Sequence, residues 1–443
     1  MGLTGPGTAV RGNRVAAVGM GLAVIATLLP PGIGNWGLIA LGVAVGTAVG
    51  IPAARNVKMT QMPQMVALFN GVGGGAVFLI AWAEFRNSGG FGAGTPTYVA
   101  IFSLFAAIVG SVSFWGSNIA FGKLQGLLPG RPITLGGAQQ PLNFVLGILT
   151  IAAAVDSAAG AHSEAIFIGM LVCAALLGNF VVLPIGGADM PVVISLLNAF
   201  TGLSAAATGI ALNNPAMIVA GMIVGASGSI LTNLMATAMN RSILAIIAGG
   251  FGGEVALGAG DGADGDRSVR STSPADAAIQ LAYARLVVVV PGYGMAVAQA
   301  QHTVRELQRA LEARGVEVEY AIHPVAGRMP GHMNVLLAEA DVPYEQLKEM
   351  DDINPEFQRT DVALVIGAND VTNPAANTQP DSPIYGMPIL EVSNARSVIV
   401  LKRSMNTGFA GVDNPLFYDE KTQLLFGDAK SSVGEVVEEL KGL

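Results

Sequence analysis

The sequence predicts a multi-span α-helical membrane bundle followed by a soluble α/β domain with a doubly wound parallel sheet. Hydrophobic residues make up 52% of the 443 residues, and Asp, Glu, Lys and Arg together make up only 12%, about half the usual charged share. The net charge is +3 over residues 1–260 and −11 over residues 261–443. In the second part, apolar strand-like runs alternate with helical patterns, which is typical of parallel sheets.

Composition and motif content exclude several classes of protein. Cys173 is the only cysteine, which excludes a disulfide-stabilised secreted scaffold. The acidic second part argues against nucleic acid as a partner. The aspartates of Gly-Ala-Gly-Asp-Gly-Ala-Asp-Gly at 258–265 lack the closing Glu of a calcium loop, so we predict no metal site.

Eight apolar segments are candidate membrane helices, because a helix needs about 20 apolar residues to cross the hydrocarbon core. The first follows Arg11 and Arg14 but leads directly into further spans, which favours a membrane helix over a cleaved signal peptide. The segments cover residues 15–29, 33–53, 65–82, 97–121, 142–155, 164–185, 190–211 and 215–239.

Basic residues indicate the orientation of these spans. If the N-terminus lies inside, the outside loops contain only Arg86, and the inside loops contain Arg11, Arg14, Arg55, Lys58, Lys123, Arg131 and Arg241. Basic loops stay on the cytoplasmic side. We therefore expect a multi-pass membrane protein whose acidic domain is cytoplasmic or on the topologically equivalent side.

Glycines recur every four residues in three of the spans. Such faces allow helix backbones to approach closely, inside a bundle or across a dimer. The repeats are Gly42, Gly46 and Gly50, then Gly71 and Gly75, then Gly221 and Gly225.

Polar residues at membrane depth are functional candidates, because they are costly there unless paired or hydrated. Asp189 directly precedes a span, where it could cap the helix or act in function. Asn198 lies about 13 Å deeper, where it could bond a neighbouring helix or line a hydrated proton path. The other candidates are Asn70, Ser113, Asn118, Asn143, Asn179, Ser227 and Asn233.

The remaining chain divides into a linker and a second domain. We assign residues 1–248 to the membrane domain, 249–274 to a flexible Gly/Asp-rich linker and 275–443 to the α/β domain. Helices are expected at 295–313, 332–340 and 430–441, after a short amphipathic stretch at 275–284. The expected strands are 286–290, 316–322, 362–366, 388–392 and 397–401.

A glycine-rich turn joins the first strand to its helix. Gly292 permits a tight turn, and Gly294 lets backbone approach a pyrophosphate at a helix N-terminus. Val297 replaces the third glycine of the dinucleotide-binding pattern. A plain strand–helix turn is the alternative.

Two features favour NADP(H) over NAD(H) if the domain binds a dinucleotide. The second strand ends in His323-Pro324 rather than in the acidic residue that usually binds the ribose 2′-hydroxyl. A later strand delivers Lys402-Arg403-Ser404 to its carboxyl end, where two cations suit a phosphate. The alternative for this pair is a solvated basic surface.

Other loops leave alternatives open. Asn369-Asp370 follows the third strand and could cap a helix or bind a nucleotide. His323 and His332 flank a loop that could be rigid packing, and neither is predicted to bind metal. The acidic stretch 341–356 is expected to be a solvated loop or a docking surface for a partner.

Long motifs in both halves carry a family resemblance. They are Gly-Tyr-Gly-Met-Ala-Val-Ala-Gln-Ala-Gln (292–301), His-Pro-Val-Ala-Gly-Arg-Met-Pro-Gly-His-Met-Asn (323–334), Gly-Ala-Asn-Asp (367–370), Lys-Arg-Ser-Met-Asn-Thr-Gly (402–408), Gly-Gly-Ala-Asp-Met-Pro-Val-Val (186–193) and Met-Asn-Arg-Ser (239–242). Over nearly its whole length, the chain closely resembles the β subunit of proton-translocating NAD(P) transhydrogenases.

The resemblance implies roles for individual residues. The turn at 292–297 would hold the pyrophosphate, Lys402 and Arg403 the 2′-phosphate, and Asp370 would act at the nicotinamide. The full set of implied cofactor contacts is Gly292, Tyr293, Gly294, Met295, Ala296, Val297, His323, Ala326, Gly327, Arg328, Gly367, Asn369, Asp370, Lys402, Arg403, Ser404, Asn406, Gly408 and, in a lid, Phe409. Proton passage or its coupling is implied for Asn70, Asp189, Asn198, Ser227, Gly228 and Arg241.

The chain departs from the family pattern at two points. Many relatives have a histidine where this chain has Asn70, which leaves the proton-carrying group open. The family's β subunit usually has nine spans, so a further span would precede residue 1.

The resemblance implies a proton-pumping NAD(P)⁺ transhydrogenase of the Si-to-Re stereospecific type. This chain would bind NADP(H), and a separate α subunit, required for activity, would bind NAD(H). Two αβ units would form a dimer in the bacterial inner membrane. The rival hypothesis is a nucleotide-gated channel or transporter with a Rossmann regulatory domain, although no potassium-filter sequence lies in a span.

Overall fold

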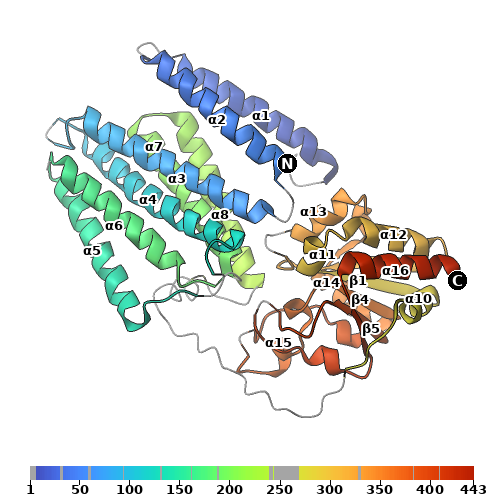
Figure 1. Cartoon of the computed structure of the whole chain (residues 1–443). Coiled ribbons are helices and arrows are strands. Elements are labelled where there is room, and N and C mark those ends of the chain that lie inside the picture. Colours follow the sequence, from blue (N-terminus) through green and yellow to red (C-terminus); the bar gives the residue numbers. More distant parts are fainter. Residues whose placement is uncertain are drawn as a thin grey trace. The chain divides into compact units, whose positions relative to one another are not determined.

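A computed structural model describes most of the chain (Figure 1). Its backbone contacts divide it into two units, Met1–Lys58 and Met59–Leu443. The described residues are 6–29, 33–57, 61–92, 94–129, 132–160, 162–186, 189–238, 243, 269–327, 331–382, 384–408 and 410–443. Most of the predicted linker, 249–268, therefore lies outside them.

Long apolar helices occupy the predicted membrane domain. Within the described ranges, eight helices are long and apolar enough to cross a membrane, which confirms the expected bundle. The first unit contains α1 (Pro6–Leu28) and α2 (Trp36–Asn56). The second contains α3 (Met62–Asn87), α4 (Thr97–Gln125), α5 (Gln139–Ala158), α6 (Glu164–Val182), α7 (Met190–Ala211) and α8 (Pro215–Ala238).

Glycine allows the backbones of α7 and α8 to touch. A Cβ added to Gly221 would lie 2.4 Å from the Ala206 nitrogen, and one added to Gly202 would lie 2.5 Å from the Gly225 nitrogen. Real Cβ atoms do not approach this closely, so the helix crossing depends on the absence of side chains. The predicted packing role of Gly221 and Gly225 is therefore confirmed.

The other predicted glycine faces behave differently. A Cβ on Gly75 would lie 3.0 Å from the Phe114 ring of α4, which is tight but not backbone on backbone. Cβ atoms on Gly42, Gly46 or Gly50 would meet nothing within 4 Å. A packing role for the α2 face remains a prediction.

The second half forms one parallel sheet. Its six strands are ordered β3-β2-β1-β4-β5-β6 and all pairs are parallel, which confirms the doubly wound, Rossmann-like sheet. The strand order reverses between β1 and β4. After β1 the chain continues to β2 on one side, and after β4 it continues to β5 on the other side. The strands are β1 (Leu286–Pro291), β2 (Glu317–Ile322), β3 (Leu347–Glu349), β4 (Val362–Ile366), β5 (Ser397–Lys402) and β6 (Thr422–Phe426).

Three strand assignments differ from the sequence prediction. The acidic stretch contains the edge strand β3, and β6 was not predicted, because its Thr-Gln start interrupts the apolar run. The strand predicted at 388–392 is wrong. There the Leu390 amide donates to the Val371 carbonyl (2.9 Å), and the chain enters the 3₁₀ turn η7 (Val392–Asn394). The side chains of Leu390 and Val392 are buried in the core of the domain, although their backbone does not join the sheet.

The helix predicted at 295–313 is interrupted. It consists of α11 (Tyr293–Val297) and α12 (Gln301–Glu312), separated by Gln299 with φ of 50°. This left-handed residue stops the first helix after little more than one turn. The remaining helices are α10 (Pro274–Ala282), α13 (His332–Glu339), α14 (Met350–Ile353), α15 (Ala375–Thr378) and α16 (Ala429–Gly442).

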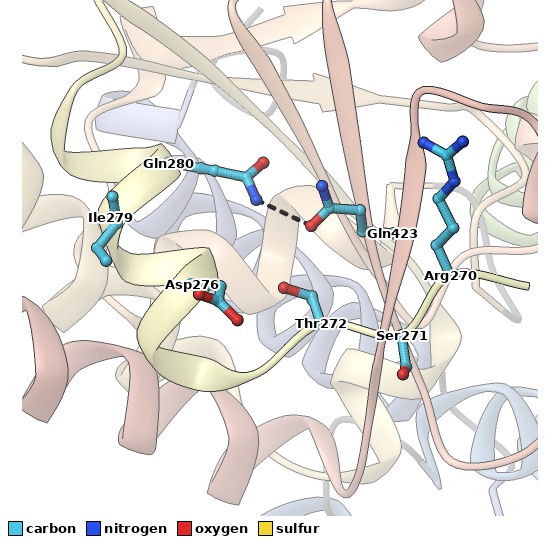
Figure 2. A pocket seen from close by; sticks show the side chains of 7 residues that line it. All are labelled: Arg270, Ser271, Thr272, Asp276, Ile279, Gln280 and Gln423. Carbon is cyan, nitrogen blue, oxygen red and sulfur yellow. Dashed lines mark hydrogen bonds between the residues drawn. The ribbon is translucent and has the colours of Figure 1, made fainter.

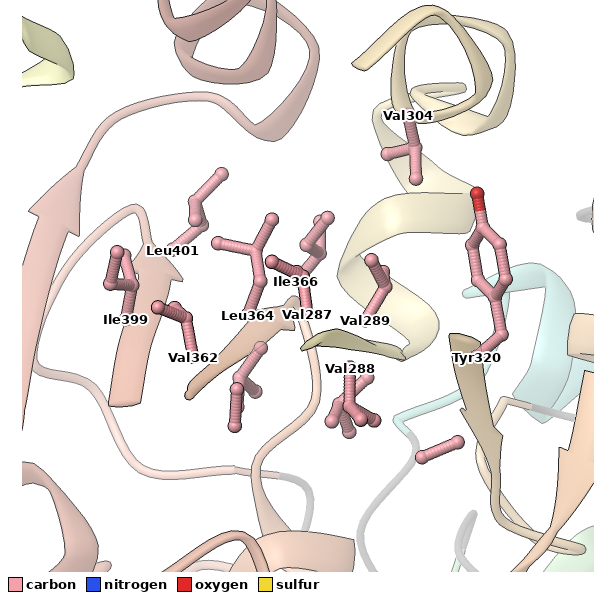
Figure 3. Close-up of a cluster of buried hydrophobic side chains, with 14 of the residues drawn as sticks. Val287, Val288, Val289, Val304, Tyr320, Val362, Leu364, Ile366, Ile399 and Leu401 are labelled. Atoms are coloured by element: carbon pink, nitrogen blue, oxygen red, sulfur yellow. The ribbon is translucent and has the colours of Figure 1, made fainter. Parts of the chain in front are cut away.

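The central strands lie within the core. Every residue of β1 and β4 is buried, as expected when helices and loops cover both faces of a parallel sheet. Figure 3 shows Val287, Val289, Leu364 and Ile366 among the side chains of this core. The buried Tyr320 hydroxyl on β2 donates to the Gln308 side chain (2.8 Å), so its polar end is satisfied. This core holds the carboxyl ends of the strands, and the loops that follow them, in fixed positions.

The α7–α8 crossing leads to a stability prediction. Gly221→Ala should lower the unfolding midpoint in detergent, since overpacking costs about 1–3 kcal/mol. Gly147→Ala on α5 is the matched control, because a Cβ there meets nothing within 4 Å and alanine favours helix by about 1 kcal/mol. Equal midpoints for the two variants would contradict a crossing that depends on glycine.

Candidate functional site

The turns after β1 and β4 contact each other through their backbones. The Gly292 amide donates to the Ile366 carbonyl (2.9 Å), and the Gly294 amide donates to the Gly367 carbonyl (3.0 Å). A Cβ on Gly294 would lie 2.7 Å from the Gly367 Cα, and a Cβ on Gly292 would lie 2.4 Å from the Ala368 Cα. Gly367 has φ of +67°, a conformation that side chains disfavour. The turns can meet only because these positions are glycine.

This contact changes the physical interpretation of the glycine pattern. Gly294 was expected to let backbone approach a pyrophosphate, and its immediate neighbour is instead the turn after β4. Met295 and Ala296 are buried in the core, whereas Tyr293 is partly buried and the Val297 side chain is 46% exposed. The pyrophosphate role of this turn remains a prediction.

His323 fastens the loop that follows β2. Its Nε2 lies 2.8 Å from the Pro388 carbonyl, and its Nδ1 accepts the Val325 amide (3.2 Å). These partners require a neutral ring that carries its proton on Nε2. Burial lowers the pKa of His323, and the bond to Pro388 only partly opposes this shift. The residue therefore has a structural role in connecting two loops.

The same loop brings His332 close to the first turn. Gly327 has φ of +112°, and a Cβ there would lie 2.5 Å from the His332 Nδ1. The ring centroids of His332 and Tyr293 are 6.3 Å apart. Ala326 is buried, and its amide donates to the His323 carbonyl (3.0 Å). The sequence-predicted segments at 292–297 and 323–332 are thus neighbours.

The loop after β4 holds the segment that follows β5. The Asp370 carboxylate accepts the Ala410 amide (2.9 Å). A Cβ on Gly408 would lie 2.4 Å from the same carboxylate. The buried Asn414 side chain donates to both the main-chain and side-chain oxygens of Asn369 (3.1 Å each). The structure therefore brings together the predicted residues of 367–370 and 402–408, and Asn414 is a connecting residue that sequence reasoning missed.

Lys402 stands at the carboxyl end of β5 with its ammonium group held in place. The Nζ atom donates to the Asn406 carbonyl (3.0 Å) and lies 4.1 Å from the centroid of the Phe417 ring. Burial lowers the pKa of Lys402, while Asp413 and Asp370 act in the opposite direction. Arg403, Ser404 and Asn406 are exposed. This edge of the sheet thus carries two adjacent cations.

In the bundle, Asn70 belongs to a polar cluster that links three helices. Its Nδ2 donates to Ser117 (2.9 Å) and Ser113 (3.3 Å) on α4. Ser113 also contacts the Thr201 hydroxyl (2.5 Å) and donates to the Leu197 carbonyl on α7. Among the described residues, the buried Asn70 Oδ1 has no hydrogen-bond partner. The cluster can therefore accept one more donor, such as water.

The other membrane candidates are less closely connected. Asn198 on α7 is partly buried, and its neighbour Ala199 is where a Cβ on Gly228 would collide, 2.9 Å from the Cα. Ser227 is exposed and donates to the carbonyl one turn earlier on α8. In the described part of the chain, Asp189 makes no side-chain capping bond to α7. The predicted site residues outside the described ranges are Arg241, Arg328 and Phe409.

Sequence reasoning placed Lys123 in a loop, but the structure buries it at the end of α4. Its side chain is buried, and Nζ donates to the carbonyls of Leu183 and Ile185 (2.8 Å to the latter). A cation is favourable at the carboxyl end of a helix, here that of α6. The sequence around Lys123 gives no signal for this arrangement. A lysine in a loop that flanks a membrane span would have the same Gly-Lys-Leu neighbours.

A separate groove lies beside the last strand of the sheet, β6, and the helix α10. It encloses about 620 Å³ and contains a bond from the Gln280 amide to the Gln423 side-chain oxygen (2.8 Å; Figure 2). None of the predicted cofactor residues lines it. Its lining consists of Arg270, Ser271, Thr272, Asp276, Ile279, Gln280 and Gln423.

Together, the bundle and the sheet define a multi-pass membrane protein that carries a Rossmann-like domain. The family model described as NAD(P) transhydrogenase beta subunit matches residues 1–439. Two curated relatives from Rhodospirillum rubrum, both called NAD(P) transhydrogenase subunit beta and one of them from strain ATCC 11170, are each 51% identical to this chain over 441 residues. That match covers 99% of this chain and 95% of each relative. The chain belongs to the NAD(P) transhydrogenase beta subunit family.

The buried His323 predicts an acid-sensitive domain. An unfolded histidine titrates near 6.5, above the lowered pKa of folded His323, so between these values the unfolded state binds more protons. The contribution of neutral His323 to the free energy of unfolding is then fully present above about pH 6.5. It falls at lower pH by up to about 1.4 kcal/mol per pH unit. Pulse proteolysis in urea can measure this slope for the soluble half of the full chain.

Variants assign that slope to one residue. His323→Gln should make the slope shallower below about pH 6.5, because the glutamine does not titrate. His302→Gln, on the exposed side of α12, is the control and should retain the slope. A His323→Gln protein with the wild-type slope would show that the acid sensitivity has another origin.

Proposed function

We propose that this chain is the NADP(H)-binding membrane subunit of a proton-pumping transhydrogenase. Hydride would pass between NADH on a partner α subunit and NADP⁺ on this chain, coupled to proton movement across the membrane. The observation that carries the proposal is the clustering, at one edge of the sheet, of the β1 turn, the β4 loop with Asp370, and the Lys402–Arg403 pair. Family membership supports the same reaction.

The side chains at this edge fit a phosphorylated dinucleotide. Lys402 and Arg403 are cations at the carboxyl end of β5, where ligands bind parallel sheets, and Ser404 adds a hydroxyl donor. No acidic residue ends β2, where an NAD(H) site would bind the ribose 2′-hydroxyl. NADP(H) supplies the hydride chemistry itself when bound. The protein's own groups would bind the phosphates, orient the nicotinamide and exclude water.

Asp370 would act at the nicotinamide end of this edge. Its carboxylate already holds the segment after β5 through the Ala410 amide. A change in that bond would move the segment containing Gly408 relative to the β4 loop. Asp370 would therefore respond to whether the segment after β5 encloses the cofactor.

Proton transfer would use polar groups of the bundle. The Asn70–Ser113–Thr201 cluster supplies amide and hydroxyl groups, and the unsatisfied Asn70 oxygen would accept a bond from water. Asp189, Asn198, Ser227, Gly228 and Arg241 would lie on or beside the path. By thermodynamic linkage, nucleotide occupancy would bias proton binding as strongly as protons bias nucleotide binding.

The assembly and location follow from the same proposal. An α subunit would carry the NAD(H) site, and two αβ units would form a dimer. The basic loops favour a multi-pass protein of the bacterial inner membrane with its acidic domain in the cytoplasm. Transhydrogenation, of the Si-to-Re type, would require both subunits.

Reconstitution tests this function. Vesicles containing the chain and an NAD(H)-binding α subunit should transfer hydride from NADH to an NADP⁺ analogue and should change internal pH at the same time. Vesicles containing either subunit alone are the controls and should do neither. Proton or ion flux that responds to nucleotide without hydride transfer would instead support a nucleotide-gated transporter.

The phosphate assignment predicts a selective loss of affinity. Arg403→Gln should weaken NADP⁺ binding by roughly 10- to 100-fold, the value of one charged hydrogen bond, and should leave NAD⁺ binding nearly unchanged. Arg396→Gln is the matched control because Arg396 precedes the same strand, where it pairs with Asp361 (2.9 Å). Calorimetric titration of the full chain measures both ligands. Equal losses for NADP⁺ and NAD⁺ would refute the assignment.

A further inference from the structure

The Lys402 ammonium group rests on an aromatic ring. Its Nζ lies 4.1 Å from the centroid of the Phe417 ring, within the distance of a favourable cation–π contact. Its hydrogen bond to the Asn406 carbonyl uses one of the three ammonium donors. Both of these contact partners are uncharged, and the carboxylates of Asp413 and Asp370 act on Lys402 electrostatically.

The ring itself is held rigidly. Phe417 is 2% exposed and lies in the 3₁₀ turn η8 (Pro415–Tyr418). Asn414 caps this turn by accepting the Leu416 amide (3.0 Å), and its side-chain amide is bonded to Asn369 of the β4 loop. A chain of contacts therefore runs from the β4 loop through Asn414 to the ring under Lys402.

The lysine backbone is fixed from the other side. Lys402 is the last residue of β5, and its carbonyl accepts the Gly427 amide (3.0 Å) after β6. A free lysine side chain loses rotamer entropy when it binds a ligand. With its backbone and ammonium both held, much of that loss has already occurred before a ligand arrives.

We propose that Phe417 is a positioning residue for cofactor selection: its ring holds the Lys402 ammonium where it can meet the 2′-phosphate of NADP(H). This inference rests on the proposed function, which assigns that phosphate to Lys402. A carboxylate in the place of the ring would compete with the phosphate for the same ammonium. The ring holds the cation weakly enough to leave its charge available.

The experiment compares the preference for NADP⁺ over NAD⁺, expressed as the ratio of their dissociation constants, in the full chain in detergent. Phe417→Leu removes the ring face but keeps an apolar side chain. It should reduce the preference by about 3- to 30-fold, the value of a cation–π contact. Phe417→Met also removes the ring, but its unbranched side chain adapts to an irregular space. It should also reduce the preference, so the test does not depend on one variant folding well.

Phe357→Leu is the matched control. Phe357 is also buried in this domain, but it lies in η5 (Asn354–Arg359), before β4 at the opposite edge of the sheet. This variant loses the same volume and should keep the wild-type preference. A loss equal to that of Phe417→Leu would mean that core truncation alone lowers the preference, and would overturn the proposal.

Lys402→Met distinguishes this inference from the function on which it rests. In the Lys402→Met background, adding Phe417→Leu should change the preference by no more than about twofold, since no cation remains for the ring to hold. If Lys402→Met lowers the preference and Phe417→Leu does not, the positioning role is wrong and the phosphate assignment stands. If Lys402→Met leaves the preference unchanged, the phosphate assignment itself is wrong.

Discussion

The direct backbone contact between the turns after β1 and β4 is the constraint on which the soluble half depends. Gly292 and Gly294 bond to the carbonyls of Ile366 and Gly367, and no side chain separates the two turns. The contact lies between β1 and β4, where the strand order reverses. Because it fixes the start of the β4 loop, it also fixes Asn369 and Asp370, which hold the segment after β5.

Further contacts connect the β4 loop to Lys402. Asn414 extends from Asn369 to the turn that carries Phe417, and Phe417 supports Lys402. The same contacts would therefore position two things. They would hold the charged group that selects the cofactor, and they would hold the segment after β5 that encloses it. This sharing offers a physical route by which a cofactor bound at Lys402 could alter the bond between Asp370 and Ala410.

In the bundle, the equivalent constraint is again close backbone approach. Glycines on α7 and α8 bring the two helices into contact at Gly202 and Gly221. The same proximity places Gly228 against Ala199, next to Asn198. The buried Lys123 bonds to a backbone carbonyl just beyond the end of α6.

Much of the fold was predictable because it depends on local patterns. The valine-rich β1 and the apolar β4 are buried on both faces and gave unambiguous strand signals. The strand β6 was missed because Thr422 and Gln423 begin it, and 388–392 was wrongly assigned because loop residues there are buried as deeply as a strand.

The site was predictable only in part. Loops after parallel strands meet at one edge, so Gly292, Asp370 and Lys402 could be grouped from the strand pattern alone. The contacts made by Asn414 and Phe417 depend on how a long loop returns to the sheet, and no periodicity encodes that path. The true neighbour of Gly294 likewise follows from strand order, which the sequence left open between β1 and β4.

A structure of the full chain with NADP⁺ bound tests the central claim most directly. The account predicts the 2′-phosphate within hydrogen-bonding distance of the Lys402 and Arg403 side chains, with the dinucleotide along the carboxyl edge of β1, β4 and β5. A cofactor bound instead in the groove beside β6 and α10, with its phosphate on Arg270, would contradict it.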